Sequence, residues 1–490
     1  MGIRGRKGPA VAIIAFAGSA LLLYLGTGPD PLPALTWLAP LPVLLLALRR
    51  PAAVAAFAAG AVGTAHSWAY FLDSDSIPVA VVPVIVVCAG LPAALTVAVF
   101  RSLRDRLLLG AFAAAATWTG ALYLVSLVSP VGVMGALATA QADVPLVTQV
   151  AAVTGMWGVE FLLVLVPAGI AAVAAGGART GIAVALVALA AAGYGAARLA
   201  EPARPGMRVA VVARADNTWA TAISGPAGRE IQQSYVDQVR GLPGDVRLVV
   251  LPEAVFTLES TQLGTALAPL RQAAEDTGAD VVIGALVHDS GRKYNTVVAL
   301  PADGGVPVVY RKRHVGDSPG ITPGEELALL PGGTALQNCM DINFPEPSRE
   351  YALAGARTMA VPADDEDVDG WQHSRTAVLR GVEHGFAVAW AATDGRTIVA
   401  DDRGRVLAES STDSTGARPF AVAVAEVPAG SGPTAFSRFG AWFAWLCLAV
   451  SVVAVAAAGY RLRRRDQPVV SPTLGVWAET SRGGAGDRRW

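Results

Sequence analysis

The chain has 490 residues, of which 53% are hydrophobic and only 16% are charged. Soluble globular domains usually carry about 25% charged residues, so a large part of this chain is not made to face water. The formal net charge of −1 argues against binding of nucleic acids through bulk electrostatics. Charged residues are few over 9–200, common over 201–432 and few again over 438–460. This distribution predicts a polytopic membrane protein with one large extramembrane domain.

The first 200 residues contain a series of apolar stretches whose lengths approach or reach the roughly 20 residues that a helix needs to cross a membrane. Together with one stretch near the end, they predict about eight transmembrane helices. The predicted spans are 9–26, 33–48, 51–72, 78–100, 107–127, 150–175, 180–199 and 438–460. The stretch 131–149 is also apolar, but Gln141, Asp143 and Pro145 interrupt it. We expect an outer-face loop or a half-inserted segment there.

The positions of Lys and Arg predict the orientation of these spans. Basic residues precede the first span and follow the second, fourth, sixth and eighth, whereas the loops 27–32, 73–77 and 128–149 contain Asp but no Lys or Arg. Cytoplasmic loops carry an excess of positive charge. We therefore expect both termini in the cytoplasm and the large domain on the extracytoplasmic side. The polar tail 461–490 is expected to be disordered.

After residue 205 the pattern changes to short β-rich runs that alternate with amphipathic helices. Strands are predicted at 208–214, 246–251, 280–286, 294–300, 306–311, 334–338, 357–362, 385–392, 397–401 and 419–426, and helices at 228–242, 261–277 and 371–383. This order predicts a layered α/β sandwich. The expected organisation is a membrane domain over 1–200, an α/β domain over 205–430, a transmembrane helix over 436–460 and the tail.

Three residues with useful chemistry each close a strand-like run of the α/β domain: Glu253, Lys312 and Cys339. Cys88 and Cys447 lie in apolar segments, so Cys339 has no partner for a disulfide within its own domain. A carboxylate, an ammonium and a thiol that converge from three strand ends would form a site for covalent acyl transfer. Lys312 would favour the thiolate and stabilise an oxyanion, while Glu253 would carry the thiol proton.

The motifs around these residues resemble a known family. Leu251-Pro-Glu253, Tyr310-Arg-Lys-Arg-His314 and Asn338-Cys-Met-Asp341 are similar to the Glu-Lys-Cys triad of the nitrilase, or carbon–nitrogen hydrolase, superfamily, and further similarities lie at 293–300, 371–374, 380–383 and 393–406. With the spans and the segments 140–145 and 155–161, the chain resembles the apolipoprotein N-acyltransferase family over roughly 9–460.

This resemblance implies an αββα sandwich and a two-step reaction. Cys339 would take an acyl chain from a phospholipid as a thioester and pass it to the N-terminal amine of a diacylglyceryl-cysteine lipoprotein. The membrane helices would let both lipid substrates reach the site from the bilayer. The resemblance implies no cofactor and no metal ion.

The sequence departs from the family pattern in its loops. The loop after Lys312 is shortened, so the glutamate that the family carries there has no clear counterpart; Asp317 and Glu325 are the acidic residues of that stretch. Met340 and Asp341 replace the Tyr-Glu that follows the family's cysteine, and an acidic stretch at 363–368 replaces an aromatic one. We expect Met340, Asp341 and Trp371 to contact substrate, although Trp371 is equally compatible with simple packing.

Two other functions are compatible with the same residues. A membrane-tethered amidase would use the triad with water as the acceptor, and a degenerate, non-catalytic paralogue would bind lipoproteins or a partner acyltransferase. Taken singly, a lone cysteine is usually a core residue, Pro-Glu a turn and a basic run a solvated surface. Their common order at strand ends favours catalysis. Arg380 and Glu383 have the spacing of a plain ion pair on a helix, and His314 and His384 are interpreted as structural.

Overall fold

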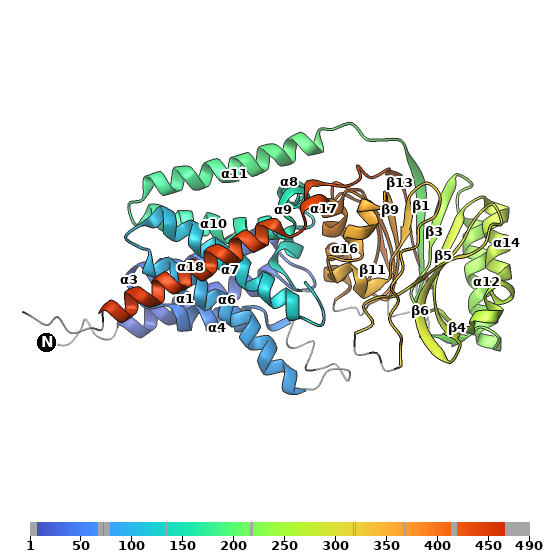
Figure 1. Ribbon diagram of the computed structural model, residues 1–490, viewed down its shortest axis with the longest axis horizontal. Coiled ribbons are helices and arrows are strands. Elements are labelled where there is room, and N and C mark those ends of the chain that lie inside the picture. The colour runs from blue at the N-terminus through green and yellow to red at the C-terminus, as the bar shows by residue number, and fades with distance from the viewer. Residues whose placement is uncertain are drawn as a thin grey trace, which may run out of the picture.

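The computed structural model describes residues 7–66, 72, 79–133, 135–215, 219–316, 318, 320–365, 369–412 and 419–465. A bundle of helices forms one end of the molecule and a pair of β-sheets forms the other (Figure 1). The segment predicted to be disordered begins at 461, but residues 461–465 continue the last described helix, and the rest, 466–490, lies outside the described residues. The proposed division into domains at 200–205, 430–436 and 460 remains a prediction.

Six helices in the described part of the chain are long and apolar enough to cross a membrane. They are α1 (Lys7–Gly26), α6 (Val82–Ser102, with a 3-10 turn before it), α7 (Leu107–Val128), α10 (Met156–Ala174), α11 (Ala178–Leu199) and α18 (Trp442–Arg465). The second predicted span falls on two shorter helices, α2 (Pro33–Thr36) and α3 (Leu41–Arg49). The third includes α4 (Ala53–Gly63), while residues 67–71 of that span lie outside the described residues.

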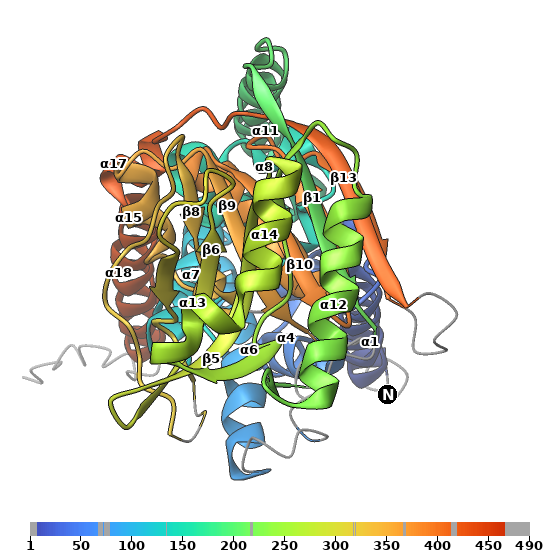
Figure 2. The same ribbon diagram turned by 90° about the vertical axis from the view of Figure 1, so that its right-hand side faces the viewer.

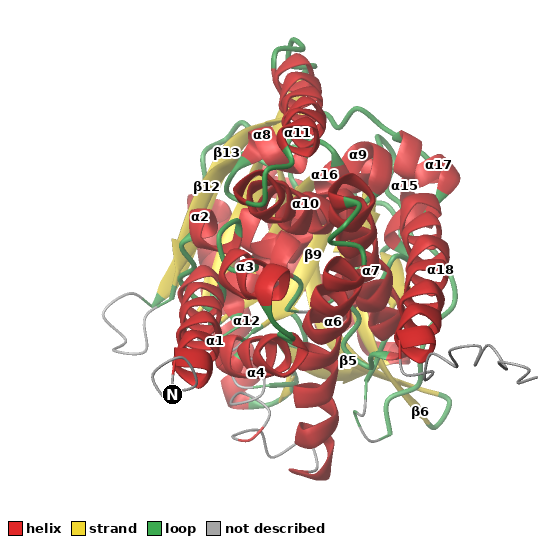
Figure 3. Cartoon of the chain, turned by 90° about the vertical axis from the view of Figure 1, so that its left-hand side faces the viewer, coloured by secondary structure: helices red, strands yellow, loops and turns green. Residues whose placement is uncertain are grey.

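Small residues let the membrane helices approach closely. A Cβ atom on Gly120 of α7 would lie 2.7 Å from the Leu448 backbone in α18, so only glycine fits at this crossing. In a lipid bilayer the hydrophobic effect does not bring helices together, so van der Waals contact between closely packed backbones stabilises the helix pair instead. Figure 3 shows α7, α10 and α18 side by side, with α11 set apart at the edge of the bundle.

The segment 131–149 folds into short turns instead of a long helix. It contains a 3-10 turn, η2 (Leu137–Gln141), and the helix α8 (Pro145–Thr148), which is followed by α9 (Ala151–Thr154). Buried Glu160 of α10 accepts hydrogen bonds from Trp118 Nε1 and from the Ala138 backbone, each at 2.8 Å. Gln141 donates to Thr36 Oγ1 at 2.8 Å and accepts from Trp37 Nε1 at 2.9 Å. Gln141, one of the polar residues that interrupt this apolar stretch, and Glu160 of α10 therefore anchor the stretch to the neighbouring helices.

The α/β domain has two packed sheets. The larger sheet has the order β13-β1-β3-β5-β4-β2, with β6 beside β5 and β7 beside β6, and the smaller has the order β12-β11-β10-β9-β8. The strands are β1 (Gly206–Arg214), β2 (Thr221–Ala222), β3 (Val246–Val250), β4 (Phe256–Glu259), β5 (Asp280–Asp289), β6 (Arg292–Leu300), β7 (Val308–Arg311), β8 (Thr334–Leu336), β9 (Thr358–Asp364), β10 (Ala387–Thr393), β11 (Arg396–Ala400), β12 (Val406–Ser411) and β13 (Phe420–Pro428).

Helices cover the outer face of each sheet. In Figure 2, α12 (Pro226–Gly241) and α14 (Ala268–Thr277) lie over the larger sheet. Figure 1 shows α16 (Gly370–His384) between the smaller sheet and the membrane helices. Strands β3 and β5 are almost wholly buried because both faces of the sheet are covered, which explains their continuous apolar sequence. The predicted αββα sandwich is confirmed.

The structure adds detail that the sequence patterns did not predict. Strands β2, β4 and β12 are additional, and each is short or carries polar residues in its pattern. The predicted helix 261–277 is divided into a 3-10 turn, α13 (Leu263–Ala266) and α14. Pro269 stands in the first turn of α14, where its missing N–H costs nothing, and it starts a new helix instead of continuing the old one.

Helix α16 ties the α/β domain to the membrane helices. Glu383 accepts a hydrogen bond from the Met156 backbone at the start of α10, at 2.6 Å. Its other oxygen forms the predicted ion pair with Arg380 Nη1 at 2.5 Å. Arg380 Nε also donates to the Ile342 carbonyl, close behind Cys339, at 2.9 Å. One buried ion pair thus joins the membrane helices to the segment that carries the cysteine.

We expect Glu383→Ala to destabilise the protein by about 3–5 kcal/mol, because it leaves the buried Arg380 charge without its partner. The matched control is Glu275→Ala, which breaks the exposed i,i+4 pair of Arg271 and Glu275 and is expected to cost less than about 1 kcal/mol. Urea unfolding of the detergent-solubilised protein, followed by tryptophan fluorescence, measures both. Equal shifts for the two variants would contradict this role of α16.

Candidate active site

Glu253 and Lys312 form a buried ion pair between two strand ends. Glu253 lies three residues after β3, and its Oε1 accepts from Lys312 Nζ at 2.7 Å. Their side chains are only 1% and 9% exposed. The turn that carries Glu253 packs tightly on β5, since a Cβ atom on Gly284 would lie 2.4 Å from the Glu253 Cα. Glycine at 284 therefore allows the carboxylate to reach the lysine.

Cys339 lies close to this pair at the end of the smaller sheet. It follows β8 and begins the 3-10 turn η4 (Cys339–Asn343), with a backbone φ of +32°. A non-glycine residue in the left-handed region is uncommon and often marks a functional turn. The thiol is 6% exposed, and its Sγ lies 3.7 Å from the Asp364 carbonyl oxygen. The structure thus brings Glu253, Lys312 and Cys339 together, as their positions at strand ends predicted.

Two asparagines that the sequence patterns did not single out complete this arrangement. Asn295 of β6 donates from Nδ2 to Glu253 Oε1 at 2.6 Å, and its Oδ1 accepts from Asn338 Nδ2 at 2.9 Å. The Asn295 backbone carbonyl also accepts from the Lys312 N–H at 2.8 Å. A chain of hydrogen bonds therefore runs from the carboxylate to the residue before Cys339. The available signal for Asn295 was a polar residue at the start of the buried half of β6.

The charges around the thiol set its resting protonation state. Burial and the Glu253 carboxylate raise the pKa of the Cys339 thiol well above its ordinary value, and the Lys312 ammonium opposes this rise. Burial disfavours the charge on Lys312, but the neighbouring Glu253 carboxylate outweighs this effect and raises its pKa. At neutral pH the site therefore holds a neutral thiol beside a charged lysine.

The residues that we expected to contact substrate have different surroundings. The Asp341 carboxylate is fully buried and accepts from Tyr310 Oη at 2.7 Å and from the His314 backbone at 2.8 Å. Trp371 is 9% exposed at the start of α16, with the Arg375 guanidinium 5.4 Å from its ring centre. Met340 is partly exposed next to Cys339. Substrate contact by these three residues remains a prediction.

The shortened loop after Lys312 is anchored next to the cysteine segment. The His314 ring stacks on Phe344 with 3.8 Å between ring centres, and its Nδ1 lies 2.9 Å from Asp341 Oδ1. This agrees with the structural role expected for His314. Glu325 is exposed, and its backbone carbonyl accepts from Arg313. Asp317 lies outside the described residues.

An acidic pair and a histidine lie on the other side of Cys339. Burial and the nearby Glu253 carboxylate raise the pKa of Asp364 to about 8, so this carboxyl is mainly protonated at neutral pH. The Cys339 sulfur, an Asp365 oxygen and a His373 ring nitrogen all lie within 4.8 Å of one another. These atom types can bind metal ions, but the Lys312 ammonium acts on both the sulfur and the imidazole. Its positive charge makes the cluster a poor site for a divalent cation.

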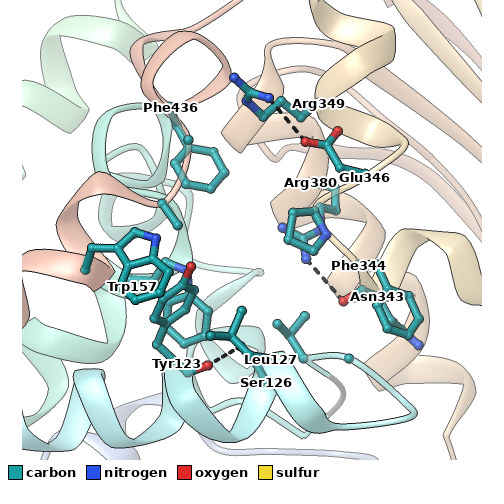
Figure 4. Close-up of a pocket in the computed structure, with 16 residues that line it drawn as sticks. Tyr123, Ser126, Leu127, Trp157, Asn343, Phe344, Glu346, Arg349, Arg380 and Phe436 are labelled. Carbon is teal, nitrogen blue, oxygen red and sulfur yellow. Dashed lines mark hydrogen bonds and ion pairs between the residues drawn. The ribbon is translucent and has the colours of Figure 1, made fainter. Parts of the chain in front are cut away.

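A cavity of about 200 Å³ opens where residues 343–346, which follow Cys339 in the chain, meet the membrane helices; Glu253, Lys312 and Cys339 are not among its lining residues. In Figure 4, Tyr123 and Trp157 lie on one side and the paired Glu346 and Arg349 on the other. Tyr123 also packs edge-on against Trp445 of α18, with 5.1 Å between ring centres. An aromatic wall from membrane helices and a polar wall from the α/β domain suit an amphipathic molecule at the bilayer interface.

Comparison with known proteins identifies both parts of the chain. The family "Carbon-nitrogen hydrolase" matches residues 214–435, and "Apolipoprotein N-acyltransferase N-terminal domain" matches residues 19–169. An (R)-stereoselective amidase from a Pseudomonas species is 31% identical over 218 residues, which are 38% of this chain and 79% of the amidase.

Two apolipoprotein N-acyltransferases are also similar to this chain, but the alignment covers a smaller part of each of them than of the amidase. The protein from Geobacter metallireducens is 32% identical over 29% of this chain and 27% of its own length. The protein from Allorhizobium ampelinum is 29% identical over 54% of this chain and 58% of its own length. The aligned regions thus span between about a quarter and three-fifths of these two relatives.

The chain belongs to the carbon–nitrogen hydrolase family, as the triad motifs and the αββα sandwich predicted. Residues 19–169 match the N-terminal domain of the apolipoprotein N-acyltransferases. The resemblance found in the sequence is therefore confirmed both in the region of membrane helices and in the α/β domain. The apolar helices and this match together make it a multi-pass membrane protein.

We expect alkylation of Cys339 by iodoacetamide to keep accelerating with pH beyond about 8.5, where a free cysteine titrates. Lys312→Met should slow the reaction further at pH 8, because Lys312 opposes the rise in the thiol pKa. Intact-mass spectrometry in a Cys88→Ala, Cys447→Ala background measures the rate. Lys293→Met is the control and should leave it unchanged. A wild-type thiol that titrates at or below its ordinary range would contradict this electrostatic picture.

Proposed function

We propose that this protein transfers an acyl chain from a phospholipid, through a thioester on Cys339, to the N-terminal amine of a diacylglyceryl-cysteine lipoprotein. The observation that carries the proposal is the buried Glu253–Lys312 ion pair beside Cys339, in a chain that also has the membrane domain of the apolipoprotein N-acyltransferases. A soluble amidase would need the first feature alone.

The first half of the reaction forms the thioester. Glu253 takes the thiol proton of Cys339, and the resulting thiolate attacks the ester carbonyl of the phospholipid. The Lys312 ammonium stabilises both the thiolate and the oxyanion of the tetrahedral intermediate, because it lies in a buried site where charges interact strongly. The carbon–oxygen bond of the intermediate then breaks, the departing alkoxide takes up a proton from an acidic group of the site to become the lysophospholipid alcohol, and the acyl chain stays on the sulfur.

The second half transfers the acyl chain to an amine. The N-terminal amine of the lipoprotein attacks the thioester, loses a proton and releases the thiol. Both substrates are lipids, and the cavity between the aromatic residues of the membrane helices and the Glu346–Arg349 pair supports access from the bilayer. Burial of the site limits competition by water for the thioester.

The same proposal includes a location. The excess of Lys and Arg in the loops predicted to be cytoplasmic supports an extracytoplasmic α/β domain, with both termini in the cytoplasm. The catalytic site would then face the outer leaflet of the bacterial cytoplasmic membrane.

The test is acylation of a synthetic diacylglyceryl-cysteine peptide by the purified protein in phospholipid–detergent micelles, measured by mass spectrometry. We expect an acyl chain on the peptide amine. Cys339→Ala should abolish the product, Glu253→Gln should slow its formation by about 10²–10⁴-fold, and Lys312→Met by about 10²–10³-fold. Cys447→Ala, which removes a buried cysteine of α18, is the control and should remain active.

Two other results would contradict the proposed acyl transfer and favour a different function. Hydrolysis of small amides without any acylation of the peptide would favour the membrane-tethered amidase. Binding of the lipopeptide without either reaction would favour the non-catalytic paralogue.

A further inference from the structure

His373 is held in a fixed orientation next to the Cys339 sulfur. Its Nδ1 lies 2.7 Å from Asp365 Oδ1, and Asp365 Oδ2 accepts from Trp390 Nε1 at 3.2 Å. The imidazole also meets the Trp390 ring edge-on, with 4.7 Å between ring centres. Both ring position and tautomer are therefore set, because a carboxylate at Nδ1 requires a proton there.

The second ring nitrogen of His373, Nε2, makes no hydrogen bond within the residues that the structure describes that would explain its burial as structural. His373 is 6% exposed, and its Nε2 has no hydrogen-bond partner in the described part of the chain. A buried polar atom without a partner costs free energy and calls for an explanation. Because a ring nitrogen of His373 lies within 4.8 Å of Cys339 Sγ, a molecule bonded to that sulfur would lie within reach of the imidazole.

We propose that His373, oriented by Asp365, is a fourth catalytic residue, which donates a proton to the leaving alcohol and later accepts one from the attacking amine. This inference rests on the proposed function. It divides the protons between two residues, so that Glu253 handles the proton of the sulfur and His373 handles the proton of the substrate.

The protons balance over the full cycle. Glu253 takes the Cys339 proton, and the thiolate attacks the ester. When the carbon–oxygen bond breaks, imidazolium His373 gives its proton to the departing alkoxide and becomes neutral. In the second half, neutral His373 takes the proton of the attacking amine. The carbon–sulfur bond then breaks, and protonated Glu253 returns its proton to the sulfur.

The charges that face His373 support the protonated resting state. Burial disfavours the imidazolium, but the Asp365 carboxylate outweighs this effect and raises the pKa of His373, with a further contribution from Asp369. The Lys312 ammonium acts in the opposite direction. An alcohol is a far weaker acid than a thiol, so an alkoxide leaves only with help from a proton donor.

The dependence of the acylation rate on the leaving group distinguishes a proton donor from a residue that only supports the structure. Acyl-enzyme formation is measured by rapid quench and intact mass with three donors of one fatty acid: a phospholipid, the ethyl ester and the p-nitrophenyl ester. p-Nitrophenolate leaves without a proton, so His373→Gln should be acylated by that ester at the wild-type rate. With the phospholipid and the ethyl ester, the same variant should be slower by about 10²-fold or more. Asp365→Asn should show the same dependence on the donor.

His384→Gln is the matched control, since His384 is a buried histidine of the same helix whose Nδ1 contacts Ser437 Oγ at 3.0 Å. Any loss there should be equal for all three donors. Equal losses in His373→Gln, or none, would overturn the inference, as would failure of every ester to acylate the wild type. If the wild type reacts with the two simple esters but not with phospholipid, the proposed function fails and the ethyl and p-nitrophenyl esters still test His373.

Discussion

The buried ion pair of Glu253 and Lys312 is the constraint on which the rest of the site depends. Neither charge would be tolerated at this depth alone, since removal of one partner leaves an uncompensated charge in a low-dielectric interior. The pair explains why Gly284 must let β5 approach the Glu253 turn and why the polar side chain of Asn295 is buried in β6. It also contributes to the neutral resting thiol, because burial and then the Glu253 carboxylate raise the pKa of Cys339, while the Lys312 ammonium opposes this rise and favours the thiolate.

A second buried pair, Arg380 with Glu383, connects this chemistry to the membrane. Arg380 contacts the Ile342 carbonyl behind the cysteine, while Glu383 contacts the Met156 backbone at the start of α10. The cavity of Figure 4 lies at the same junction, with Arg380 among its lining residues. The segment that carries Cys339 is therefore fixed between the β-sheets and the membrane helices, where a lipid ester would have to be presented.

The sequence predicted those features that depend on local pattern. Long apolar runs identified the six long apolar helices of the described residues, although the predicted spans 33–48 and 51–72 fall on shorter helices. Alternating runs identified ten strands, and strand ends identified Glu253, Lys312 and Cys339. Asn338 stands in the cysteine motif and Asn295 in the similar stretch 293–300, but their hydrogen bonds join segments distant in sequence, so no local pattern assigned them a role. Asp365 and His373 stand in two segments that were named from the sequence, 363–368 and 371–374. Their contact with each other and with Cys339 depends on the tertiary fold, so no local pattern assigned them a role. Strands β2, β4 and β12 are short or polar, so their own sequences do not indicate a strand. They form because they pair with neighbouring strands of the sheets.

The central claim is that Cys339 carries the acyl chain between two lipids, and the acyl-enzyme itself tests this most directly. The purified protein is incubated with phospholipid in the absence of any acceptor and its intact mass is measured, with Cys339→Ala in parallel. The account predicts a mass increase of one acyl chain that hydroxylamine removes and that the variant lacks. An unchanged wild-type mass, with a known apolipoprotein N-acyltransferase acylated under the same conditions, would contradict it.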